Sequence, residues 1–253
     1  MFKEVKNLLS FLTIIPVSMD KDCLTDSAKF MFLFPLVGAF IGFLAGLFGW
    51  ITAHFLPSLV VGTLVLGVLL LITGLHHTDG LLDFGDGIMA HGSAERKIEI
   101  MHDQLTGAGG LSLGIMTFLV TAFAIGELAK LNSSIIIQSL IVVEVLAKLS
   151  MVIATWAGKA VRKGMNSPFM EAMHGKNGNA RLIAALTISF AIVVPLMWLA
   201  GVVTLLAATI SSLVMVSIAH RHFNGVTGDV LGATNELTRM VSLIVLLAVI
   251  RWL

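Results

Sequence analysis

The chain has 253 residues, of which 57% are hydrophobic and 12% are charged, and its formal net charge at pH 7 is +1. Soluble domains carry about 25% charged residues, so a soluble globule of this composition would expose large apolar patches. The high hydrophobicity excludes a disordered chain, and the near-neutral charge gives no electrostatic footprint for nucleic acid. The single cysteine, Cys23, excludes an internal disulfide framework. The composition predicts an all-α polytopic membrane helix bundle, formed as one integral-membrane domain over residues 1–253.

Apolar segments long enough to cross a bilayer recur along the chain. A hydrocarbon core of about 30 Å needs about 20 mostly apolar helical residues. Six segments meet this requirement: 30–53, 59–75, 111–128, 135–157, 182–200 and 202–219. A seventh, 237–253, is shorter and carries Arg239 and Arg251. We therefore expect about seven transmembrane helices.

The first apolar stretch, residues 8–17, is too short to span and contains Pro16. Its length predicts an interfacial or re-entrant element. In the first span, Gly38, Gly42 and Gly46 recur at four-residue spacing, which predicts close packing against another helix.

The basic residues predict the orientation of the spans. With the N-terminus inside and seven alternating spans, the inner side holds thirteen of the sixteen lysines and arginines: Lys3, Lys6, Lys21, Lys29, Arg96, Lys97, Lys159, Arg162, Lys163, Lys176, Arg181, Arg221 and Arg239. This bias follows the positive-inside rule. The inner loops also hold most of the Asp, His and Gly motifs. We therefore expect a multi-pass protein of the cell (inner) membrane whose active site faces the cytoplasm, with the lipid bilayer as a partner and a homo-oligomer left open.

Residues 76–87, after the second span, read His-His-Thr-Asp-Gly-Leu-Leu-Asp-Phe-Gly-Asp-Gly. If this segment is helical, Asp79, Asp83 and Asp86 lie along one face. Three carboxylates this close repel one another unless a cation neutralises them, and hard oxygen ligands suit Mg²⁺. The pattern predicts a magnesium site, with Asp103 of the amphipathic segment 96–103 as a fourth carboxylate. The alternative is a solvated acidic loop.

Glu144 and Lys148 lie four residues apart within a predicted span, so they can pair on one helix face. Charged residues at this depth usually face a cavity or the bundle interior. Structural pairing and substrate contact are both open for them.

The aspartate spacing resembles the D-G-x-x-A-R motif of CDP-alcohol phosphotransferases, but Asp83 stands in place of the alanine and no arginine follows. The chain resembles the cobalamin synthase (adenosylcobinamide-GDP ribazoletransferase) family far better. Residues 74–87 read as its G-x-x-H-x-D-G-L-x-D-x-x-D-G motif, and residues 225–237 as its G-x-T-G-D-x-x-G-A-x-x-E-L motif. Residues 10–17, 34–38 and 96–103 resemble further motifs of that family. Departures include Ile14 and Lys148, each in place of an arginine.

The resemblance implies a reaction in which a ribose hydroxyl of α-ribazole, or of its 5′-phosphate, attacks adenosylcobinamide-GDP and releases GMP. Mg²⁺ held by Asp79, Asp83, Asp86 and Asp103 would neutralise the diphosphate. The expected catalytic residues are His77, Asp79 and Asp103. His77 is the candidate general base, with Asp103 and Asp229 as alternatives. A purely structural role for His77, as a buried histidine that hydrogen-bonds a neighbour, is equally open. The residues expected to bind substrate are Arg96, Lys148, Arg162, Thr227, Gly228, Asp229 and Glu236.

Two other function classes remain as alternatives. A CDP-alcohol phosphotransferase-like enzyme would share the metal chemistry but use a lipid nucleotide. A membrane transporter would use charges at the bilayer midplane, such as Glu127, Glu144 and Lys148, together with inverted repeats. The chain has no convincing internal repeat, and its polar motifs lie in loops at one face.

Overall fold

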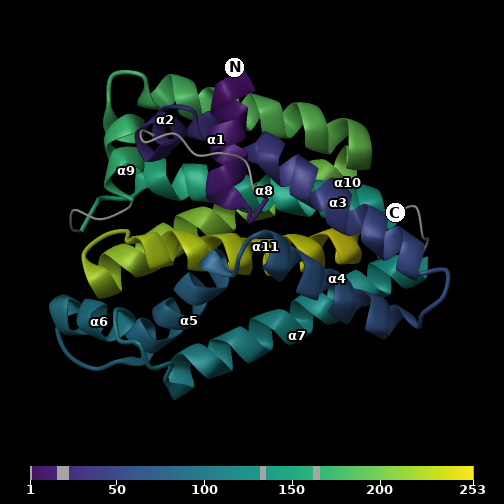
Figure 1. Cartoon of the computed structure of the whole chain (residues 1–253), viewed down its shortest axis with the longest axis horizontal. Coiled ribbons are helices and arrows are strands. Elements are labelled where there is room, and N and C mark those ends of the chain that lie inside the picture. The colour runs from purple at the N-terminus through teal and green to yellow at the C-terminus, as the bar shows by residue number, and fades with distance from the viewer. Residues whose placement is uncertain (1, 16–22, 132–134, 162–165, 253) are drawn as a thin grey trace.

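The computed structural model describes residues 2–15, 23–131, 135–161 and 166–252, and within these ranges the chain is helical without a β-strand (Figure 1). The predicted all-α fold is therefore confirmed. The helices in chain order are α1 (Phe2–Leu12), α2 (Cys23–Lys29), the 3₁₀ turn η1 (Met31–Leu33), α3 (Phe34–Thr52), α4 (Ser58–Ile72), α5 (His76–Met89), α6 (Ala94–Met101), α7 (Ala108–Leu131), α8 (Ile135–Ala157), α9 (Ser167–His174), α10 (Gly178–Phe223) and α11 (Gly228–Trp252).

Five helical stretches in the described residues are long and apolar enough to cross a membrane: Met31–Thr52, α7, α8, α10 and α11. A sixth crossing results if α4 and α5, which meet at an angle of 98°, count as one broken span. Between them Gly74 and Leu75 turn the chain with φ values of 64° and 62°. Because α5 leaves the direction of α4, we treat α4 as the crossing segment and α5 as a helix at the membrane edge.

The 46 residues of α10 form two antiparallel segments, as Figure 1 shows. A straight helix of that length would extend about 69 Å, at 1.5 Å per residue. Both of its ends nevertheless lie beside the same end of α8. Trp156 Nε1 donates to Asn179 Oδ1 at 2.9 Å, and the Lys159 amide donates to His220 Nε2 at 3.1 Å. The chain reverses at Trp198, whose φ of 46° and ψ of −127° are non-helical. The two predicted spans are therefore separate crossings, which agrees with about seven in all.

The buried centre of the bundle is α8, and α3 packs along it through the glycines at four-residue spacing (Figure 1). A Cβ on Gly38 would overlap the carbonyl oxygen of Glu144, and one on Gly42 would overlap that of Leu140. A Cβ on Gly46 would come within 2.7 Å of the Ile137 Cα. The predicted packing role of these glycines is confirmed.

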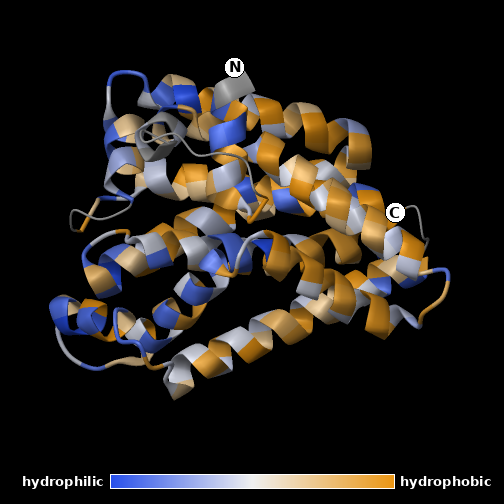
Figure 2. Cartoon of the chain, viewed as in Figure 1, coloured by the Kyte–Doolittle hydropathy of each residue, from blue (hydrophilic) through white to orange (hydrophobic). Residues whose placement is uncertain are grey.

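One end of the bundle, which we call the polar end, is formed by α5, α6, α9, the last turn of α10 and the first turn of α11. Figure 2 shows hydrophilic residues gathered over α5, α6 and α9. Of the predicted interfacial element, residues 8–12 belong to α1, and the amide of Ile14 donates to the carbonyl of Ile72 at 2.8 Å. Residues 16 and 17 lie outside the described part of the chain. The short α1 thus ends where α4 gives way to α5.

Candidate active site

The helix α5 carries the three aspartates of the first motif, so this segment, which was expected among the loops at one face, is helical. Burial is the largest cause that raises the pKa of Asp83 to about 7, and the negative charges of Asp79, Asp229 and Asp86 raise it further. Three carboxylates therefore repel the ionised form of Asp83, which is itself partly buried. Such a group favours a bound cation, because a cation removes the repulsion.

The first turns of α5 and α11 lie in backbone contact at the polar end. A Cβ on Gly80 would come within 2.9 Å of the Asp229 Cα, and one on Gly232 would come within 3.2 Å of the His77 Cα. Only glycine allows helix backbones to approach this closely. The two glycines bring together two motifs that are about 150 residues apart in the sequence.

The start of α11 is held in place by its backbone and capped by a side chain. The Val226 amide donates to the Lys159 carbonyl at 2.7 Å. Thr227 Oγ1 accepts from the Val230 amide at 3.3 Å and lies 3.4 Å from Asp229 Oδ2. A Cβ on Gly228 would meet no atom within 4 Å. The N-terminus of α11 therefore borders open space, where amide groups favour an anion. The sequence placed this motif in a loop, whereas the structure begins a helix at Gly228.

Asp86 holds the start of α7 in addition to its place beside Asp83. Its Oδ2 accepts from the Gly107 amide at 2.7 Å and its Oδ1 from the Gly110 amide at 2.8 Å. Asp103, expected as the fourth carboxylate, lies on the loop after α6, where its Oδ1 accepts from the Leu105 amide at 3.3 Å. The residue that completes the group around Asp83 is Asp229 of the second motif. Spacing along the sequence does not reveal that Asp229, in place of Asp103, is the fourth carboxylate of this group.

His77 lies behind the contact between α5 and α11. Its side chain is buried, and its Nδ1 has no hydrogen-bond partner among the described residues. Burial, followed by the charges of Lys148 and Arg239, lowers the pKa of His77 well below its usual value. Burial therefore favours the neutral form of this imidazole, which faces the interior. A histidine that the sequence reasoning did not single out, His102, lies with its Nε2 4.0 Å from Asp229 Oδ2.

The basic side chains of α6 lie in different surroundings. Arg96 is exposed on α6 and pairs with Glu99 at 3.1 Å. Its neighbour Lys97, which was not predicted, lies with its Nζ 2.9 Å from His222 Nδ1 and joins α6 to the end of α10. Arg162 lies outside the described residues.

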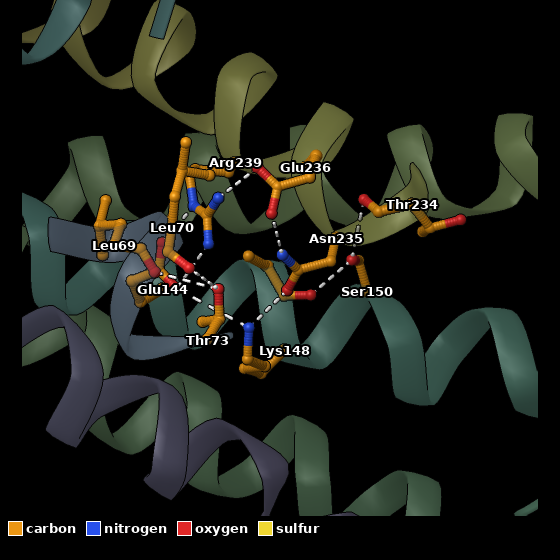
Figure 3. A network of polar contacts seen from close by, with 11 residues as sticks. Leu69, Leu70, Thr73, Glu144, Lys148, Ser150, Thr234, Asn235, Glu236 and Arg239 are labelled. Carbon is orange, nitrogen blue, oxygen red and sulfur yellow. Dashed lines mark hydrogen bonds and ion pairs between the residues drawn. The ribbon is translucent and has the colours of Figure 1, made fainter. Parts of the chain in front are cut away.

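Lys148 and Glu236, expected to bind substrate, are buried in the bundle (Figure 3). Lys148 Nζ donates to Asn235 Oδ1 at 2.6 Å, and Glu236 pairs with Arg239. Arg239, assigned to the inner surface by the topology argument, is also fully buried. Glu236 and Arg239 point from α11 toward α8, and Lys148 of α8 points toward α11, so all three side chains are at most 1% exposed.

The carboxylate oxygens of this group are of the kind that bind Mg²⁺, but they do not by themselves form a complete coordination shell. Within the described ranges, no three Asp, Glu, His or Cys side chains are arranged to hold a metal ion. Mg²⁺ usually takes only one or two carboxylates and keeps its other positions for water and substrate phosphates. Asp79 and Asp83, with Asp229 across the helix contact, supply such carboxylates.

Comparison with known proteins adds an independent finding. The model of the cobalamin-5-phosphate synthase family matches residues 4–247. The chain belongs to this family. The two motifs in contact at the polar end, 74–87 and 225–237, both lie within the matched residues.

Three relatives illustrate the similarity, and each is named adenosylcobinamide-GDP ribazoletransferase. The protein of Methanosarcina mazei is 34% identical, over 95% of this chain and 90% of its own length. That of Thermococcus kodakarensis is 33% identical, over 98% and 99% respectively. That of Methanococcoides burtonii is 31% identical, over 96% and 90%. No solved structure matches this chain significantly.

Proposed function

We propose that this protein joins adenosylcobinamide-GDP to α-ribazole or α-ribazole 5′-phosphate and releases GMP, which assembles the nucleotide loop of cobalamin. A ribose hydroxyl attacks the phosphorus attached to the cobinamide arm. The new P–O bond forms as the P–O bond to GMP breaks, and the hydroxyl proton passes to a carboxylate. The observation that carries this proposal is the backbone contact of Gly80 with Asp229, which joins the family's two motifs at one site.

The carboxylates supply the cation site that this chemistry needs. Asp79 and Asp83 would hold Mg²⁺ against the diphosphate, with Asp229 adjacent. When bound, the ion neutralises charge on the phosphoryl oxygens as GMP leaves. Asp86 keeps α7 in place through Gly107 and Gly110, so its part in the site is chiefly to hold the helices around the other carboxylates.

The start of α11 suits the substrate's anionic or hydroxyl groups. The open space at Gly228 leaves room beside the first amides of the helix, which favour negative charge. Asp229 accepts the hydrogen bond and then the proton of the attacking hydroxyl, in place of the buried His77. Lys97 and Arg96 on α6 lie at the same end and attract the leaving GMP.

The protein acts in the cell membrane with the polar end toward the cytoplasm. The apolar crossings support the membrane location, and the basic residues of the inner loops support the orientation. Substrates that dissolve in water reach the site from this side without crossing the bilayer.

The test is a defined reaction with the detergent-purified chain. Adenosylcobinamide-GDP, α-ribazole or its phosphate, and Mg²⁺ are supplied, and GMP and the cobalamin product are measured by mass spectrometry. Product that forms with Mg²⁺, and stops when the ion is chelated, supports the proposal. A parallel reaction with a CDP-lipid and an alcohol tests the phosphotransferase alternative. Turnover of the CDP-lipid without cobalamin formation would overturn the proposal.

A further inference from the structure

Five side chains from α8 and α11 form a polar network inside the bundle (Figure 3). Arg239 pairs with both Glu144 and Glu236. Its Nη2 also donates to Glu144 Oε2 at 3.2 Å. Lys148 Nζ lies 2.6 Å from Asn235 Oδ1 and 3.8 Å from Glu144 Oε2. Asn235 Nδ2 donates to Glu236 Oε1 at 3.1 Å, which closes the network.

The network balances two carboxylates against two cations, and each of its five residues is at most 1% exposed. Removing ions from water costs several kcal/mol per ion, and well-packed apolar residues often give equal or greater stability. Stability alone therefore does not account for four buried charges. Ionisable residues within membrane bundles are ordinarily tied to function.

The network lies directly behind the candidate active site along α11. Asp229 and Glu236 are seven residues apart, which is two helical turns or about 10 Å along the axis. Between them is Gly232, the residue that contacts the His77 backbone of α5. The network therefore joins α11 to α8 one turn beyond the point where α11 meets α5.

Further bonds extend the connection to α10. Ser212 Oγ donates to the Ser150 carbonyl at 2.7 Å, and Ser150 Oγ lies 3.4 Å from the Thr234 carbonyl. The bonds around the network thus join α8, α10 and α11. These bonds restrict both the sliding of α11 along its axis and its rotation.

We propose that the buried network of Glu144, Lys148, Asn235, Glu236 and Arg239 is a positioning device that sets the rotation of α11, and thereby the placement of Asp229 opposite the aspartates of α5. A shift of one residue along α11 would turn it by about 100°. That turn would take Arg239 away from Glu144, and the bundle interior offers no water to replace the lost bonds. Asp229 belongs to the same continuous helix as Arg239. The network that fixes the rotation of α11 at Arg239 therefore also fixes the position of Asp229.

The test compares variants of the full chain in detergent or nanodiscs and rests on the proposed transferase reaction. Asn235→Leu removes the bonds to Lys148 and Glu236 without changing the charge balance, so the protein is expected to fold. Arg239→Met and Arg239→Lys compare loss of the cation with a conservative replacement. Arg251→Met is the matched control, since Arg251 lies on the same helix and pairs at 2.5 Å with the half-exposed Glu127, far from the site.

We expect Asn235→Leu to lower kcat per folded protein about tenfold or more, with KM for both substrates within about twofold, because small misplacements of reacting groups are costly. Arg239→Lys should regain part of the activity that Arg239→Met loses, and Arg251→Met should keep the kcat of the unmodified chain. A drop in thermal stability with an unchanged kcat per folded molecule would overturn the proposal, as would a rise in KM alone. Absence of GMP release from the unmodified chain would instead refute the proposed function.

Discussion

Gly80 on α5 and Asp229 on α11 lie in backbone contact, such that a Cβ on Gly80 would come within 2.9 Å of both the Cα and the carbonyl oxygen of Asp229. The aspartates of α5 are therefore held at a fixed distance from the carboxylate that begins α11. This close approach is the structural basis of the candidate site, and it suggests direct tests.

Replacing Gly80 with alanine should separate α5 from α11. Overpacking in a close contact costs about 1–3 kcal/mol, and displaced catalytic groups lose activity steeply. We expect kcat to fall about tenfold or more and the melting temperature to fall with it. Gly67→Ala in α4 is the control, because a Cβ there would meet no atom within 4 Å. Equal activity of the two variants would contradict the role given to this contact.

Substitution of the carboxylates should distinguish the two candidates for the fourth position. We expect Asp83→Asn and Asp229→Asn each to lower kcat about 100-fold or more, as loss of a preorganised electrostatic group does. Asp103→Asn should cost clearly less, since Asp103 is bonded to the Leu105 amide on a loop. Initial rates of GMP release measure the difference. A larger loss from Asp103→Asn than from Asp229→Asn would restore the original expectation for Asp103.

Removing the side chain of Asp86 should affect stability through α7. The carboxylate caps that helix through the amides of Gly107 and Gly110, and loss of such a cap costs about 0.5–2 kcal/mol. Asp86→Ala should therefore lower the melting temperature in the absence of Mg²⁺. Asp86→Asn keeps one acceptor oxygen, so its melting temperature should lie between those of Asp86→Ala and the unmodified chain. A melting temperature of Asp86→Ala equal to that of the unmodified chain would rule out the capping role.

The contribution of Asp83 to the stability of the metal-free protein should decrease as pH rises from about 4 to 7. The pKa of Asp83 is about 7 in the folded chain against an ordinary value of 3.8, so the folded state binds more protons in this window. By linkage, the part of the free energy of unfolding that Asp83 contributes then falls with increasing pH, whereas the lowered pKa of His77 contributes with the opposite sign. Thermal melts of the unmodified chain and of Asp83→Asn across this range isolate the contribution, because the variant should gain stability relative to the unmodified chain as pH rises. Mg²⁺ should raise the melting temperature more at pH 7.5 than at pH 5, because binding requires the ionised carboxylate.

Much of the architecture could be predicted because it depends on local properties. Hydropathy over about 20 residues identified the crossings, including both segments of α10, since each must cover its backbone and apolar side chains within lipid. The spacing of Asp79, Asp83 and Asp86 places them on one face if the segment is helical, and α5 is that helix. The four-residue glycine repeat predicted the packing of α3, because helix neighbours recur at that interval.

The parts that were missed depend on contacts between distant segments. The sequence by itself determined that the chain is a membrane helix bundle of this family, with its aspartates on one helix. Only the tertiary structure decided that Asp229 rather than Asp103 lies beside Asp83, and that Glu236 turns inward. The pairing of Lys148 with Glu144 was one of two alternatives that the sequence left open, and the structure shows it. The physical reason is that a side chain's surroundings follow from how helices meet, here through Gly80 and Gly232, and no spacing along one helix determines that meeting.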